Sequence, residues 1–152
     1  MADEDQDLQR RLEDFLDKAA KAKAAREQEE KRRIEGPKLF ADAFAAVSVR
    51  KIRPILEEAC RPWADRGLPA EVTDDWVSSR PSVRLNVEPN PGLKGSLVYE
   101  GHAEDRTIVA YRHFGPGAGD AIGRLALNDI TREMVQSHVD VFLSEVIRLG
   151  GQ

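Results

Sequence analysis

The sequence predicts an α+β protein with a long N-terminal helix, a second helix kinked at a proline, an antiparallel meander of three or four strands, and a C-terminal helix packed on the sheet. Two patterns predict this class. Apolar residues recur at helical spacing near both ends of the chain, whereas they alternate with polar residues in between. Helices before and after a block of strands are typical of an antiparallel sheet, and not of a parallel α/β sheet.

The first element is a charged helical arm over residues 1–36, which precedes an α+β body over residues 37–152. No glycine or proline occurs before Gly36, and alanine, leucine, glutamate, lysine and arginine dominate the segment. Acidic residues at its start and basic residues at its end both oppose the helix dipole favourably. Gly36 and Pro37 are expected to end this helix.

A second helix is expected from Lys38 to Arg66, because apolar residues continue at helical spacing and Gly67 follows. Pro54 lies inside this pattern. An interior proline removes a backbone hydrogen bond and clashes with the preceding turn, so either a kink or two shorter helices should result.

The sheet is expected to begin after a loop at residues 70–82. Residues 83–88 alternate between apolar and polar side chains, which predicts a strand with one buried face. Residues 96–102 and 107–114 are rich in valine, isoleucine and aromatic residues and predict two more strands. Residues 122–127 are short and would form at most a fourth strand, at the sheet edge.

The last helix is expected to be capped by Asn128 or Asp129 and to end at Gly150 and Gly151. Its apolar residues follow steps of four and three, which predicts one buried stripe. The stripe comprises Val135, Val139, Phe142, Val146 and Leu149.

Composition excludes several classes of protein. The net charge of −4 is a poor match for non-specific binding to nucleic acid, which needs a concentrated positive field. Cys60 is the single cysteine, so no intramolecular disulfide can form, as suits a reducing compartment. The acidic N-terminus does not resemble a secretory signal, and no apolar run is long enough to span a membrane. We therefore expect a cytoplasmic protein.

No catalytic, metal-binding or cofactor-binding motif is apparent. The glycines of the 115–120 loop have the wrong spacing for a phosphate cradle, and Pro116 removes a donor. His102, His113 and His138 show no metal-ligand spacing. We therefore expect no cofactor, no metal, and no enzymatic activity, although an enzyme with an unfamiliar site stays an alternative.

A basic cluster on the second helix is a candidate phosphate-binding site. Arg50, Lys51, Arg53 and Arg61 lie along this helix, and positions 50, 53 and 61 fall within one broad sector of it. Glu57 and Glu58 interrupt the cluster, so a solvated face with local ion pairs is the alternative.

The strongest candidate for function is an apolar stripe in the arm, formed by Leu8, Leu12, Phe15 and Leu16. Alanines are the only apolar side chains between Ala20 and Arg33, so a charged stretch separates the stripe from the body. An isolated apolar stripe of this kind indicates a contact site. The seam lasts about two heptads before charged residues occupy it, so a long coiled coil is not expected. Folding back on the second helix and disorder are the alternatives.

The sequence thus predicts a non-enzymatic interaction or adaptor protein that acts through its arm, with a homodimer or a protein partner. An acidic chaperone of the secretion or effector type is one alternative. A nucleic-acid-associated regulator that uses the basic cluster is the other. No motif is specific to a protein family.

Overall fold

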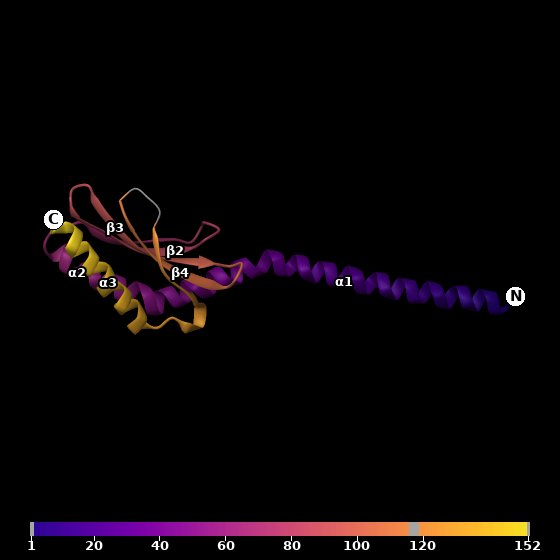
Figure 1. Ribbon diagram of the computed structural model, residues 1–152. Coiled ribbons are helices and arrows are strands. Elements are labelled where there is room, and N and C mark those ends of the chain that lie inside the picture. Colours follow the sequence, from indigo (N-terminus) through magenta and orange to yellow (C-terminus); the bar gives the residue numbers. More distant parts are fainter. Residues whose placement is uncertain (1, 116–118, 152) are drawn as a thin grey trace. The chain divides into compact units, whose positions relative to one another are not determined.

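The computed structural model describes residues 2–115 and 119–151, which divide into two compact units, Met1–Lys38 and Leu39–Gln152. Helix α1 is continuous from Ala2 to Val47, so the described part of the first unit is entirely helical (Figure 1). The second unit holds the last turns of α1 and all later elements. These are the π-helical segment η1 (Ser48–Ile52), α2 (Arg53–Asp65), β1 (Ala70–Asp75), β2 (Ser82–Asn90), β3 (Leu93–His102), β4 (Thr107–Phe114), β5 (Asp120–Ala126), the short 3-10 turn η2 (Leu127–Asp129) and α3 (Arg132–Gly150).

The expected end of the first helix at Gly36 and Pro37 is wrong, because α1 continues for ten residues past Pro37. Pro37 removes the backbone donor that would bond the carbonyl of Arg33. Arg33 is exposed, so water can satisfy that carbonyl. Phe40 and Phe44 are buried on the following turns, and their packing in the second unit holds those turns in helical form.

The irregularity expected at Pro54 takes the form of a π-helical segment directly before α2, without a loop. In η1 the backbone N–H of Arg53 donates to the carbonyl of Ser48, five residues back. Pro54 then falls in the first turn of α2, where its missing N–H costs least. The proline therefore marks a change of helix type.

The sheet has five antiparallel strands in the order β1-β2-β3-β4-β5, so the prediction of a meander is confirmed and the expected number of three or four is wrong. The region expected to be a loop contains β1, in which Val72 pairs with Leu85 of β2. Strand β5 is the expected edge strand, and it pairs with β4 alone.

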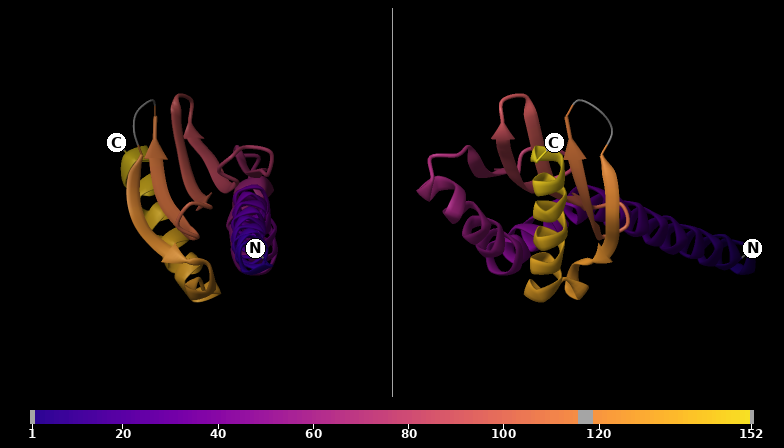
Figure 2. Two further views of the ribbon diagram at one scale, coloured as in Figure 1. Left: turned by 90° about the vertical axis from the view of Figure 1, so that its right-hand side faces the viewer. Right: turned by 60° about the vertical axis from the view of Figure 1, so that its left-hand side comes forward.

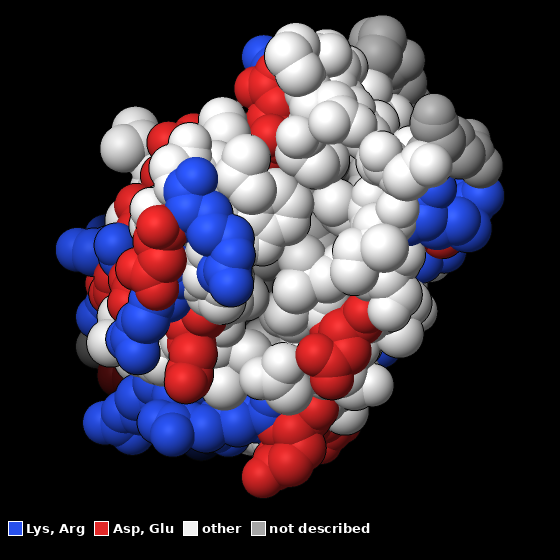
Figure 3. Space-filling view, turned by 90° about the vertical axis from the view of Figure 1, so that its left-hand side faces the viewer, with Lys and Arg blue, Asp and Glu red and all other residues white. Residues whose placement is uncertain are grey.

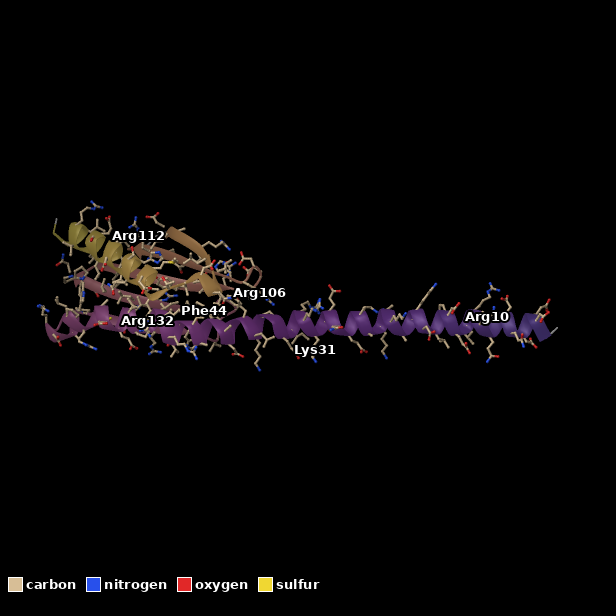
Figure 4. The ribbon with its side chains drawn as sticks, turned by 90° about the horizontal axis from the view of Figure 1, so that it is seen from below. Arg10, Lys31, Phe44, Arg106, Arg112 and Arg132 are labelled. Carbon is tan, nitrogen blue, oxygen red and sulfur yellow. The ribbon has the colours of Figure 1, made fainter. Side chains whose placement is uncertain are left out.

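Within the second unit, α2 and α3 lie on one face of the sheet, as the C-terminal helix was expected to do (Figure 2). Alternate residues of β2 and β3 point into this layer and are fully buried. A Cβ added at Gly101 would lie 2.9 Å from the Phe40 ring, and one at Gly95 would lie 3.3 Å from the Phe142 ring. Phe44 lies near the C-terminal end of α1 (Figure 4). Its ring meets that of Trp76 edge to face.

The cap expected at Asn128 or Asp129 is wrong, since both residues belong to the 3-10 turn η2. Thr131 is the N-cap of α3, and its side chain accepts a hydrogen bond from the backbone N–H of Met134 at 3.2 Å. The predicted stripe is confirmed: Val135, Val139, Phe142 and Val146 are buried, and Leu149 is half-buried.

Candidate functional site

The apolar stripe predicted in the first unit is exposed along α1. The exposed fractions are 64% for Leu8, 52% for Leu12, 67% for Phe15 and 54% for Leu16. A single helix has no second element in its own unit to cover such residues, and its side chains project on all sides, as those of Arg10 and Lys31 do (Figure 4). Covering each large side chain would contribute about 1.5–3 kcal/mol. The stripe can therefore act as a docking surface.

The first unit gains little stability from its own side chains. The ion pairs found there join Arg11 to Asp7 and Arg33 to Glu30, each at 3.8 Å and largely exposed. Such pairs contribute a few tenths of a kcal/mol at most, roughly 0.3–0.5 for this spacing. An isolated helix in water is marginal without packing, so this segment would gain order from a partner.

The basic cluster on the second helix is largely occupied by contacts within the body. Arg53 bridges Glu57 and Asp74, with both nitrogen–oxygen distances at 2.7 Å. The hydrogen bond to Glu57 is the main reason that the pKa of Arg53 is raised. The Lys51 ammonium donates to the carbonyl of Ile130 at 3.1 Å. Of the three predicted phosphate-binding residues, Arg50 alone has a fully exposed side chain.

Arg50 contributes its backbone to a contact that the sequence did not reveal. Arg132 donates from Nε to the Arg50 carbonyl at 3.0 Å. In a regular α-helix this carbonyl would accept from residue 54, but Pro54 has no N–H. Together with the Lys51 hydrogen bond to Ile130, this contact ties η1 to the start of α3. A phosphate-binding role for the cluster stays a prediction.

Charged side chains of both signs are interleaved on the surface of the body. Figure 3 shows lysine and arginine next to aspartate and glutamate, with uncharged residues between the groups. Phosphate backbones are bound by concentrated positive charge. On this face the basic side chains lie beside acidic ones, and a broad part of the face is uncharged.

The three histidines occupy separate places in the sheet and α3. His102 pairs with Thr107 and His113 pairs with Ser96, at opposite ends of the β3–β4 ladder. They share one face but do not converge. Among the described residues, no group of three histidine, cysteine, aspartate or glutamate side chains could hold a metal ion.

His102 belongs to a polar network at one corner of the sheet. Its Nε2 lies 2.8 Å from Glu100, and its Nδ1 lies 3.5 Å from Glu104. Arg80 lies 3.1 Å from Glu104 and 3.7 Å from Glu100, and the Tyr111 hydroxyl donates to Glu100 at 3.3 Å. Sequence reasoning missed this cluster, although the two-residue spacing of Glu100 and His102 places them on one strand face.

The chemistry of this network favours a structural role. His102 is 8% exposed, and each of its ring nitrogens faces a carboxylate. A general base must reach a substrate proton, directly or through one water. Nε2 of His102 is engaged with Glu100, and Nδ1 faces the exposed carboxylate of Glu104. The network ties β3 to the loop before β2 through Arg80.

His138 forms a second polar contact, inside the helix–sheet layer. The Tyr99 hydroxyl lies 2.8 Å from Nδ1 of His138, and the two rings stack at 5.9 Å. Burial lowers the pKa of His138 and raises that of Tyr99. Both side chains are therefore neutral at pH 7, and the histidine tautomer decides which of the two groups donates the hydrogen bond.

Cys60 and the glycine-rich loop show few features of a functional site. Burial raises the pKa of Cys60, which is the opposite of what an activated thiol needs. The glycine-rich loop falls partly on residues 116–118, which lie outside the described residues. Where it is described, Gly115 has φ +69°, a backbone conformation that glycine adopts readily.

The sheet face opposite the helices carries a shallow polar hollow over β1, β2 and β3. Thr73, Arg84, Asn86 and Ser96 are among its lining residues. Asn86 donates to the Thr73 hydroxyl at 3.0 Å and accepts from Ser96 at 2.7 Å. Thr73, Asn86 and Ser96 thus bond one another, whereas charged side chains of both signs, among them Glu71, Arg84 and Lys94, line the rest of the hollow.

In comparisons with known proteins, no family model, curated protein or solved structure matches this chain. Within the part of the chain that the structure describes, no helix has both the length and the apolar content to cross a membrane.

Proposed function

We propose that this protein is a non-enzymatic interaction or adaptor protein that acts through the N-terminal part of α1, with a second copy or another protein as partner. The exposed apolar stripe of Leu8, Leu12, Phe15 and Leu16 carries the proposal. These residues lie on one side of the helical first unit, in whose described part Ile34 is the other large apolar side chain that is exposed. A cytoplasmic location agrees with the single cysteine and stays part of the proposal.

The polar clusters of the body support this proposal indirectly. The networks around His102 and at Tyr99–His138 are internally satisfied. In the hollow on the open sheet face, Thr73, Asn86 and Ser96 bond one another. These contacts favour a scaffold role for the body over an enzymatic one.

An acidic chaperone is the second candidate, and the edge of the sheet favours it. Strand β5 pairs on one side only, so its outer edge offers unpaired backbone groups. Such an edge can accept an extended peptide as an added strand. Ile122 and Leu125 of β5 are half-buried and would provide apolar contacts for that peptide.

The test compares the wild-type chain with the double variant Leu12→Asp, Leu16→Asp by multi-angle light scattering and by capture of partners. We expect the variant to lose oligomeric mass or partner capture while the body keeps its melting temperature, because the charges prevent burial of the stripe. The matched control is Gln6→Asp with Ala24→Asp, which adds the same charge on the opposite side of the helix.

The control should behave like the wild type. If the Leu12 and Leu16 variant keeps its mass and its partners but melts at a lower temperature, the stripe packs on its own body and the proposal is wrong. If the edge of β5 is the binding site, capture should instead be lost when Ile122 is replaced by proline.

A further inference from the structure

The apolar stripe lies on a helix whose charge changes sign along its length. Residues 3–17 contain seven acidic and two basic side chains, for a net charge of −5. Residues 18–33 contain seven basic and three acidic side chains, for a net charge of +4. Both segments belong to the uninterrupted helix α1. A partner helix of opposite polarity would therefore match this charge distribution.

A parallel, in-register pair of these helices would be unfavourable. The seam that starts at Leu8 and Leu12 continues in steps of three and four to Arg26, Glu29 and Arg33. A parallel pair places each of these charged residues against its own copy. It also aligns the two acidic segments, and likewise the two basic segments, so the net charges repel along the whole length.

An antiparallel pair centred near Asp17 removes most of these conflicts. In this alignment Phe15 faces Ala19 of the second copy, and Leu12 faces Ala22. Each large side chain thus meets a small one, twice by symmetry, as close packing requires. Leu8 faces the aliphatic part of Arg26. A like-charge contact persists between Asp5 and Glu29, near the ends of the paired segment.

We propose that residues 2–33 of α1 pair antiparallel with the same residues of a second copy, the acidic segment of each lying along the basic segment of the other. This proposal rests on the proposed function and identifies the partner as another copy of the chain. The overlap of about 30 residues is roughly 45 Å long. The two helix dipoles also oppose each other in this arrangement.

Disulfide cross-linking tests the orientation. All chains carry Cys60→Ser, so that the introduced thiols are the only ones. Leu12→Cys chains are mixed with size-tagged Ala22→Cys chains and oxidised. We expect the mixed cross-link to form at least ten times faster than the Leu12→Cys self-link. The matched control replaces Ala22→Cys with Ala20→Cys, which lies off the seam and should cross-link slowly. Circular dichroism verifies that every variant keeps its helix content.

Salt dependence provides an independent measurement on the wild-type chain. Attraction between the acidic and basic segments is screened by salt. We therefore expect the dimer dissociation constant to rise several-fold between 50 and 500 mM NaCl. A parallel pair would give the opposite trend, because salt would screen its repulsion.

The failure of this inference can be told apart from the failure of the proposed function. A dominant Leu12→Cys self-link, or dimerisation that salt strengthens, overturns the antiparallel pairing and leaves arm-mediated binding intact. A chain that stays monomeric up to about 0.5 mM and forms no cross-links overturns pairing with a second copy. The proposed function is then tested separately, by whether the double variant Leu12→Asp, Leu16→Asp still captures a protein partner.

Discussion

At the scale of single residues, the buried contacts of the body are specific enough to predict the effects of substitutions. The hydrogen bond between Tyr99 and His138 joins β3 to α3 inside the helix–sheet layer. Tyr99 is fully buried, so its hydroxyl depends on His138 as its hydrogen-bond partner. Through this contact, the ionisable side chain of His138 becomes part of the packing between the helix and the sheet.

We expect this histidine to make stability depend on pH. Unfolded histidine takes up a proton near pH 6.5, whereas burial lowers the pKa of His138 in the folded protein. Between the two pKa values the unfolded state binds more protons. The free energy of unfolding should therefore fall as the pH drops below about 6.5.

Urea unfolding at pH 7.5, 6.0 and 5.0 measures this effect. His138→Gln keeps an acceptor for the Tyr99 hydroxyl but cannot titrate, so its stability should change less over this range. Equal slopes for the wild type and His138→Gln would show that His138 does not contribute.

Gly101 is a position where a single methyl group should be costly. Its added Cβ would lie 2.9 Å from the Phe40 ring and 3.2 Å from Pro81. We expect Gly101→Ala to lower the free energy of unfolding by about 1–3 kcal/mol, as overpacked cores do. Chemical denaturation measures the loss.

Gly123→Ala is the matched control, because nothing lies within 4 Å of an added Cβ at that strand position. It should leave stability unchanged or raise it slightly, since alanine restricts the unfolded chain more than glycine does. A Gly101→Ala variant as stable as Gly123→Ala would contradict the close packing of Phe40 on β3.

At the scale of elements, the junction between η1 and α2 depends on a residue 82 positions away in the chain. Arg132 donates to the Arg50 carbonyl that Pro54 leaves without its helical donor. We expect Arg132→Met to lower the free energy of unfolding by about 1 kcal/mol, the usual cost of losing such a hydrogen bond.

A double-mutant cycle with Pro54→Ala tests the reason for this cost. Alanine restores a backbone N–H at position 54, so Arg132→Met should cost less in the Pro54→Ala chain than in the wild type. Equal costs in the two chains would mean that the Arg132 contact does not compensate for the proline.

The helices and strands also show which parts of the fold can be predicted from sequence patterns and which cannot. Strands β2, β3 and β4 and the buried stripe of α3 follow directly from apolar spacing, and the structure confirms them. Strand β1 was missed because its sequence, AEVTDD, is rich in residues that strands disfavour. Pairing of Val72 with Leu85 and packing against α2 stabilise it, and neither contact is visible locally.

The start of α3 and the expected end of α1 were also predicted wrongly, because both depend on contacts or geometry that the local sequence does not show. Asn128, Asp129 and Thr131 can all cap a helix, and only the backbone geometry selects Thr131. Pro37 would end an isolated helix, but the buried rings of Phe40 and Phe44 carry α1 onward. Of the candidate sites, the exposed stripe could be read from spacing alone, whereas the partners of Lys51 and Arg53 required the tertiary fold.

At the scale of the whole molecule, the chain divides between Lys38 and Leu39 into a unit with little to bury and a unit with a full core. This division predicts that a shortened chain that starts at Gly36 keeps the fold of the body. Its melting temperature should stay within a few degrees of the wild type, because none of the buried core residues lies before Phe40.

Differential scanning calorimetry of the shortened and full chains measures this outcome. A large drop in melting temperature would mean that residues 1–35 stabilise the body. Loss of oligomeric mass without loss of melting temperature would agree with the proposed role of α1.

The continuity of α1 across this division has a consequence for proteolysis. Ten lysine and arginine residues precede Leu39, yet all of them lie on helical backbone, which does not fit a protease cleft until it unwinds. Trypsin should therefore cut this stretch at a rate set by local opening of the helix, and dilution that separates two chains should speed the cutting. The digestion rate would then report directly on whether the segment is covered.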